Sequence, residues 1–228
     1  MLAIALRQAA RRGGHDLQAV TAAVILASRV HRNQRRSADG QPYLVHPLQV
    51  ALLVCHWGGS QDDVITALLH DTAEDNPDGP RAILNHIADL FGDAVSQRVS
   101  AVTKNRGIAN ASDRAQDLLM RLCEALPQLG PGVAAIRLAD RLHNTVTSNH
   151  FDAARLQRLL LDNQHTIKPV ADQVCVPAVG QFLIDGPARW WRVSPSAFLP
   201  EMLALQPPWL PLWQHRRATA ALPTCPSP

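Results

Sequence analysis

Apolar residues recur every three to four positions along most of the chain, and alternating stretches typical of β-strands are scarce. That spacing places apolar side chains on one face of an α-helix. It predicts helices over 16–34, 47–57, 80–91, 93–104, 113–126, 134–148, 152–168 and 169–184, after a helix-like start. The fold class is therefore all-α.

Local signals fix several helix ends. Ser60 followed by Asp63 matches a capping box, in which the two residues bond each other's backbone N–H groups. It predicts a further helix that begins near Ser60. Pro127 predicts the end of the 113–126 helix, because proline has no N–H to continue the hydrogen-bond ladder. The inward side chains of the 80–91 and 93–104 helices are Ile83, Ile87, Leu90, Val95, Val99 and Val102.

The stretch LLHDTAEDN, 68–76, places one histidine and three carboxylates at the end of an apolar run. Burying such charge costs free energy unless a cation neutralises it. On a continuous helix, His70 and Asp71 lie about 100° apart, and Glu74 and Asp75 lie one turn further along the same broad face. We interpret the stretch as half of a metal site. The alternative is a surface helix that ends in acidic residues.

Imidazole and carboxylate ligands favour Mn, Fe or Zn over Ca or Mg. No cysteine lies near the stretch, which argues against a structural zinc.

A second polar group lies in AAIRLADRLHNTVTS, 134–148. Asp140, Asn144 and Thr147 share a helix face, and apolar neighbours suggest that Asp140 points into the bundle. A buried aspartate needs a partner. On spacing alone, that partner is either a metal ion or one of the neighbouring arginines, Arg137 and Arg141.

His31 ends the inner stripe of the 16–34 helix. A single histidine at such a position is either a core residue with its own hydrogen bonds or a metal ligand. The residues alone leave both interpretations open.

Composition narrows the function classes. The 228 residues carry a net charge of only +3, which does not indicate an electrostatic binder of nucleic acid. The four cysteines lack CxxC spacing and are expected to be reduced thiols. We see no signal peptide, and no segment approaches the roughly 20 apolar residues of a membrane span. A cytoplasmic protein without membrane contact is therefore expected.

The last 42 residues differ from the rest, because they hold nine of the seventeen prolines and four of the five tryptophans. This segment is too apolar for a solvated linker. We expect a main domain over 1–186 and an extension over 187–228 that packs on the body or on a second copy in a homo-oligomer.

Five motifs occur together in a fixed order: His31, QPYLVHP (41–47), HDTAED (70–75), VTK (102–104) and LADRLHNTVT (138–147). Together they resemble the hydrolase domain of the RelA/SpoT alarmone family, over about residues 21–168. The family's synthetase and regulatory regions are absent. The resemblance implies an HD-domain helical bundle and a small, stand-alone alarmone hydrolase.

Transferred position by position, the resemblance implies several roles. The implied ligands of one Mn²⁺ are His31, His70, Asp71 and Asp140. The residues implied to position and deprotonate the attacking water are Glu74 and Asp75. Those implied to hold the nucleotide substrate are Asn144 and Thr147, with Arg35, Lys104 and Arg141 as phosphate contacts.

The implied reaction removes pyrophosphate from the 3′ position of guanosine tetra- or pentaphosphate. Family members often carry a basic side chain two to three turns before the first metal histidine, where it stacks on guanine. Residues 21–23 here are Thr-Ala-Ala. Adenosine alarmones or another phosphorylated nucleotide are therefore the first alternative, and a nucleotide-binding regulator without turnover is the second.

Overall fold

The computed structural model describes residues 1–37, 40–75, 79–148, 151–168 and 170, without the side chains of 75 and 166. Regular structure in these ranges is helical, apart from one isolated bridge between Arg35 and Pro42. The all-α prediction is confirmed. The predicted 169–184 helix and the 187–228 extension lie outside the described residues.

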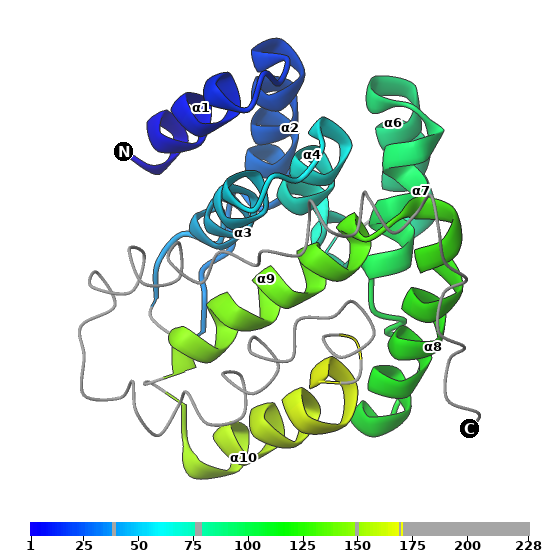
Figure 1. Cartoon of the computed structure of the whole chain (residues 1–228). Coiled ribbons are helices and arrows are strands. Elements are labelled where there is room, and N and C mark those ends of the chain that lie inside the picture. Colours follow the sequence, from blue (N-terminus) through cyan, green and yellow to red (C-terminus); the bar gives the residue numbers. More distant parts are fainter. Residues whose placement is uncertain (38–39, 76–78, 149–150, 169, 171–228) are drawn as a thin grey trace.

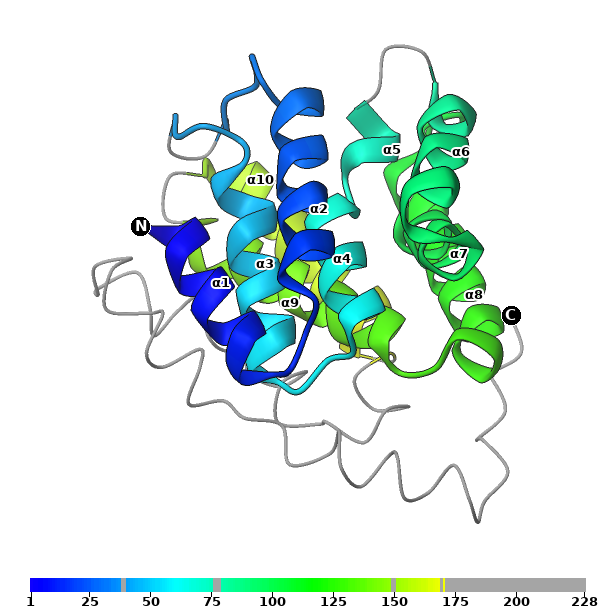
Figure 2. The ribbon, with the colours of Figure 1, turned by 90° about the horizontal axis from the view of Figure 1, so that it is seen from above.

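The bundle is built around one long, buried helix (Figure 1). That helix is α9, Gly132–Val146. Four helices lie side by side across it (Figure 2): α1 (Leu2–Arg12), α2 (Leu17–Val30), α3 (Val45–His56) and α4 (Gln61–Leu69). Among these, α3 contacts α1, α4 and α9, so it links the layer to the central helix.

The remaining helices flank α9 on other sides (Figure 1). A second group comprises α6 (Pro80–Phe91), α7 (Asp93–Val102) and α8 (Ala111–Leu129). The chain then continues into α10 (Ala153–Asp162) and a π-helical turn, η2 (Asn163–Ile167). Both α4 and α8 also contact α9, which is therefore enclosed by several elements.

Burial follows the predicted periodicity with one exception. Ile83 and Ile87 are buried, as are all three predicted valines of α7. Leu90 is 51% exposed, so its predicted inward position is wrong. It lies at the last turn of α6, just before the chain reverses at Gly92.

The start of α4 confirms the predicted capping box. The Ser60 hydroxyl accepts from the Asp63 N–H at 3.2 Å, and the Asp63 carboxylate accepts from the Ser60 N–H at 3.0 Å. The end of α8 differs from the prediction, because the helix runs past Pro127 to Leu129. A proline prevents its own N–H bond only, and the Gly130 N–H still bonds the Leu126 carbonyl at 3.0 Å.

The central stretch is not one helix. The first part, α4, ends at Leu69, and a separate short helix, α5, covers Thr72–Asp75. The Thr72 hydroxyl donates to the Leu69 carbonyl at 2.6 Å, so a side chain competes for a backbone acceptor at this point. His70 and Asp71 therefore lie at a junction between two helices.

None of the helices in the described ranges is long and apolar enough to cross a membrane.

The first turn of α9 lies directly against α4. A Cβ on Gly132 would overlap the carboxylate of Asp63, which caps α4. We predict that Gly132→Ala lowers the free energy of unfolding by about 1–3 kcal/mol, because the helices must separate. Urea denaturation measures this change.

Gly107→Ala is the matched control, since its Cβ would meet only the Asn105 side-chain oxygen, at 3.1 Å. We expect a change within about 0.5 kcal/mol for this exposed loop. Equal stability of Gly132→Ala and the wild type would contradict the described contact between α4 and α9.

Candidate metal centre

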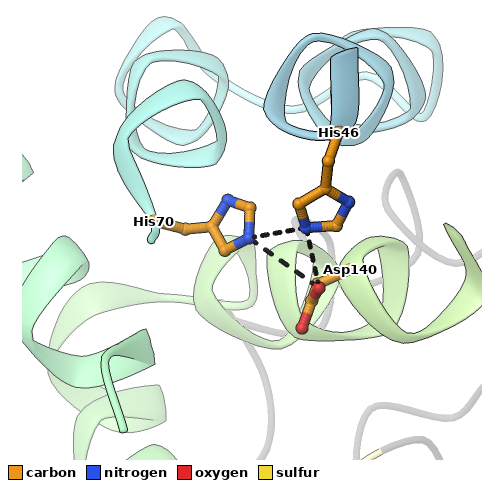
Figure 3. A group of neighbouring side chains, drawn as sticks. All are labelled: His46, His70 and Asp140. Atoms are coloured by element: carbon orange, nitrogen blue, oxygen red, sulfur yellow. Dashed lines mark hydrogen bonds and ion pairs between the residues drawn. The ribbon is translucent and has the colours of Figure 1, made fainter. Parts of the chain in front are cut away.

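Three elements direct polar side chains to one buried point (Figure 3). His46 comes from the first turn of α3, His70 follows the last residue of α4, and Asp140 lies in the middle of α9. Each is at most 3% exposed. All three can offer one ligand atom, and these atoms lie within 4.8 Å of one another.

The individual distances are short. The Nε2 atom of His46 lies 3.2 Å from Nε2 of His70 and 3.1 Å from Oδ1 of Asp140. Asp71 adds a fourth group, with Oδ2 at 3.1 Å from His70 Nε2 and 3.4 Å from His46 Nε2. The four groups form a single cluster of two imidazoles and two carboxylates.

Backbone and side-chain contacts orient two of these groups. His70 Nδ1 lies 2.8 Å from the Ala67 carbonyl, which can only accept, so Nδ1 carries the proton. The neutral His70 ring therefore presents the lone pair of Nε2 to the cluster. Asp71 is fixed by the Tyr43 hydroxyl, which donates to Oδ2 at 2.8 Å.

The cluster strongly favours added positive charge. Burial alone would lower the pKa of His70, but Asp71 and Asp140 outweigh burial and raise that pKa to about 10. Burial would raise the pKa of both carboxyls, yet their cationic partners hold each well below its usual range. For Asp140 the main partner is Arg137, followed by the two histidines.

Arg137 is the second charge on α9 that this site buries. It is 0% exposed, and its Nη1 donates to Asp140 Oδ2 at 2.8 Å. Its Nε and Nη2 atoms are buried and find no hydrogen-bond partner among the described residues. The sequence left either an arginine or a metal ion as the partner of Asp140. In the structure one oxygen pairs with Arg137, and the other faces the imidazoles.

Glu74 lies on α5, beside the cluster. Its side chain is 8% exposed, and Oε1 accepts from the Lys104 N–H at 2.8 Å. Burial is the main reason that the pKa of Glu74 is raised above its usual value. Lys104 Nζ lies 4.0 Å away and Arg106 Nε 3.8 Å away, so cations surround this carboxyl. The predicted partner Asp75 also lies in α5, but its side chain falls outside the described residues.

Asn144 and Thr147, predicted to hold the nucleotide, lie one and two turns beyond Asp140 and share a contact. Arg36 Nη2 donates to Asn144 Oδ1 at 3.3 Å and to Thr147 Oγ1 at 2.9 Å. Arg36 is only 7% exposed, although it belongs to a loop. Arg36 is not among the residues predicted from the sequence, which include its neighbour Arg35.

The three predicted phosphate contacts lie in different places. Arg35 is exposed and donates to the Gly40 carbonyl at 2.9 Å. Lys104 is half-buried beside Glu74. Arg141 forms an ion pair with Asp162 of α10. Lys104 contacts Glu74, which lies beside the metal cluster.

His31 differs most from its predicted place. It is buried at the end of α2, where its ring lies 4.7 Å from the Tyr43 ring. Among the described residues, the group whose ligand atoms converge contains His46 and not His31. The position of His31 on the inner face of the 16–34 helix predicted its burial correctly. The helix ends at Val30, and the His31 ring lies against Tyr43.

The sequence did hold a signal for His46. It precedes Pro47, which suits the first turn of a helix. A histidine there projects from a helix start toward α9, and the histidine motif QPYLVHP already marked this segment.

The cluster suits a divalent metal ion. Ligand atoms held about 2.0–2.2 Å from one cation lie about 3.0–3.6 Å from each other. The two imidazoles lie 3.2 Å from each other and 3.1 to 3.8 Å from the two carboxylates. Two nitrogens that face each other at 3.2 Å need a cation or a proton between them. The donor set therefore fits a metal ion without rearrangement of the fold.

Comparison with known proteins identifies the family of this helical domain. The model of the HD domain family matches residues 23–172. The chain belongs to the HD-domain family. Guanosine-3′,5′-bis(diphosphate) 3′-pyrophosphohydrolase MESH1 from Homo sapiens is 33% identical over 134 residues, which cover 58% of this chain and 70% of that protein. The chain is thus homologous to the MESH1 hydrolases, as the resemblance indicated.

Longer relatives share the same HD domain. A GTP pyrophosphokinase from Myxococcus xanthus is 30% identical over 80% of this chain but 24% of its own length. A guanosine-3′,5′-bis(diphosphate) 3′-pyrophosphohydrolase from Aquifex aeolicus is 31% identical over 70% of this chain and 22% of its length. This chain therefore spans about a quarter of these two relatives.

A solved structure supports the fold. It is described as a metazoan ortholog of SpoT that hydrolyzes ppGpp, and it covers 75% of this chain and 94% of its own. The TM-score is 0.56 at 21% identity.

The buried pair of Arg137 and Asp140 gives a stability prediction for the metal-free protein. We predict that Arg137→Met lowers the free energy of unfolding by about 3–5 kcal/mol, because Asp140 then keeps a buried charge without its arginine. Arg137→Lys should lose less, since only Nη1 has a partner in the native site. Urea denaturation with a chelator present compares the two.

Equal losses for methionine and lysine at position 137 would contradict this account and assign the effect to packing.

Proposed function

We propose that this chain is a metal-dependent hydrolase that removes pyrophosphate from the 3′ position of guanosine tetra- or pentaphosphate. The observation that carries this proposal is the buried cluster of His46, His70, Asp71 and Asp140, with Glu74 beside it. Similarity to MESH1, which is named for this reaction, supplies the substrate.

In this proposal one Mn²⁺ is held by His46, His70, Asp71 and Asp140. His46 takes the place that the sequence analysis gave to His31, because its Nε2 lies within 3.1–3.4 Å of the other three groups. The bound ion supplies Lewis-acid chemistry, which polarises a phosphoryl oxygen and makes water a stronger nucleophile at neutral pH. The mixed nitrogen and oxygen ligands suit manganese, iron or zinc, and the choice of manganese among them rests on the resemblance to the RelA/SpoT family.

Glu74 is the proposed general base. A carboxyl accepts a proton most usefully when its pKa lies near the working pH, and burial raises the pKa of Glu74 in that direction. The Lys104 N–H holds one of its oxygens at 2.8 Å and so fixes its orientation. Asp75 keeps its proposed role as the second acidic residue on α5.

The proposed nucleotide contacts are Asn144 and Thr147, and we add Arg36. Arg36 already bridges both residues, so its guanidinium lies where a charged nucleotide would be held. Arginine suits phosphate because its fork donates two hydrogen bonds at once. Lys104, Arg35 and Arg141 remain proposed phosphate contacts, and the last two also contact the Gly40 carbonyl and Asp162.

The position of Arg36 also bears on the base. The adenosine alternative arose because residues 21–23 lack a basic side chain two to three turns before His31. With His46 as the first metal ligand, the corresponding region includes Arg36. This chain therefore has a basic side chain in that region, as family members often do. The departure at residues 21–23 no longer counts against a guanosine substrate.

Metal binding discriminates between the two histidines. We predict that His46→Ala weakens Mn²⁺ binding by at least about 100-fold, because a ligand is lost. His31→Phe keeps a ring against Tyr43 and should bind Mn²⁺ within about threefold of the wild type. Isothermal titration calorimetry of the chelator-treated protein measures both. The reverse pattern would restore His31 as the ligand.

Turnover tests the reaction itself. With Mn²⁺ we expect guanosine tetraphosphate to give GDP and pyrophosphate, and Glu74→Gln to lower kcat by about 10²–10⁴-fold. Because the pKa of Glu74 is raised, activity should fall with acidification at a pH above the ordinary value of 4.5. Chromatography of the nucleotides follows the products.

Asp62→Asn is the control, since this exposed carboxyl pairs only loosely with Arg98, at 3.7 Å. Cleavage of adenosine substrates alone would overturn the guanosine proposal. Binding of nucleotide without any cleavage, equal in the wild type and in Glu74→Gln, would instead indicate a regulator.

A further inference from the structure

The ring nitrogen of His46 that faces away from His70 has its own partner (Figure 3). This atom, Nδ1, lies 2.9 Å from Nδ1 of His143 on α9. His143 is 3% exposed. Two ring nitrogens at this distance share one proton, so one of them donates and the other accepts.

Arg36 approaches the same nitrogen of His143 as a second donor. Its Nη1 lies 2.8 Å from His143 Nδ1 and 3.3 Å from His143 Nε2, so Nδ1 is the nearer partner. A guanidinium can only donate hydrogen bonds. Both contacts are met when the single lone pair of His143 Nδ1 is shared by two donors, Arg36 Nη1–H and His46 Nδ1–H, so the proton between the two histidines belongs to His46 Nδ1.

Gln49 fixes the opposite side of the same ring. Its side-chain oxygen contacts His143 Nε2, and an amide oxygen only accepts. His143 Nε2 consequently carries the ring proton. Gln49 lies one turn after His46 on α3, so a single helix supplies both ends of the connection through His143.

We propose that Gln49 and His143 are positioning residues that hold His46 in the tautomer with Nδ1 protonated. In that tautomer Nε2 presents its lone pair to His70, Asp71 and Asp140. The opposite tautomer places a proton where the ion would bind. This inference rests on the metal set given under Proposed function, and it adds the residues that make His46 a competent ligand.

The geometry of a metal-ligating histidine explains why such partners matter. The nitrogen that does not bind the ion usually donates to an acceptor, which fixes the tautomer and the ring plane. Here that acceptor is a second histidine, which becomes an acceptor only because Gln49 and Arg36 define its protons. Removing the Gln49 oxygen should release His143, and with it His46.

The test compares Gln49→Met with Gln49→Glu in the full chain. Both side chains are unbranched and similar in length to glutamine, but only glutamate keeps an oxygen that accepts from His143. We expect Gln49→Met to weaken Mn²⁺ binding by about 10–100-fold, and Gln49→Glu to match or exceed the wild type. Calorimetric titration of the chelator-treated proteins with Mn²⁺ gives the dissociation constants.

A second background guards against simple misfolding. In His143→Asn, the amide oxygen stands near the former Nδ1 and can accept from His46 without help from Gln49. Adding Gln49→Met to this background should change Mn²⁺ affinity by less than about threefold. Circular dichroism establishes that each variant is folded.

The outcomes separate this inference from the metal site. A wild-type chain that binds no Mn²⁺ overturns the proposed ligand set before any variant is compared. If the wild type binds Mn²⁺ and Gln49→Met and Gln49→Glu bind equally well, only the positioning role fails. An undiminished effect of Gln49→Met in the His143→Asn background also overturns it.

Discussion

The neutralisation of Asp140 is the interaction on which the rest of the site depends. A carboxylate near the centre of the longest buried helix is costly unless cationic partners surround it. Arg137 takes one oxygen, whereas the other faces His46 and His70. Arg137 lies on α9 itself and holds one oxygen in place, whereas the other accepts from Asn144 Nδ2 at 2.6 Å and faces the cluster.

Packing of the helices brings the other ligands of the cluster to the Asp140 carboxylate. Apolar faces of α3 and α4 fit against α9, and their ends bring His46 and His70 to the same depth as Asp140. The junction after Leu69 matters as much as the helices. It turns Asp71 back toward His70, so two consecutive residues serve one point instead of separate sides of a helix.

Sequence patterns predicted most helices and several site residues for a clear reason. Charged or polar residues interrupt apolar runs at His70, Asp71, Glu74 and Asp140. Burying such groups costs free energy unless they are paired, so they stand out as candidate site residues. In the structure His70, Asp71 and Asp140 converge on one point together with His46, and Glu74 lies on the adjoining helix α5.

The sequence could not predict in which direction a side chain points where a helix ends or a loop begins. His31 is buried as expected, but it is the C-cap residue of α2 and its ring lies against Tyr43. Arg35 and Arg36 are neighbours in a loop, and only the fold determines which enters the interior. The 68–76 segment is not one continuous helix, because α4 ends at Leu69 and α5 begins at Thr72, whose hydroxyl bonds the Leu69 carbonyl.

The ligands come from elements far apart along the chain, which has a consequence for assembly. No local fragment contains His46, His70 and Asp140 in reach of one another, since only the packing of α3, α4 and α9 unites them. An ion held by this trio would bind the folded state much more tightly than the unfolded chain. Its concentration then contributes directly to how much of the protein is folded, so cation supply and protein lifetime become linked.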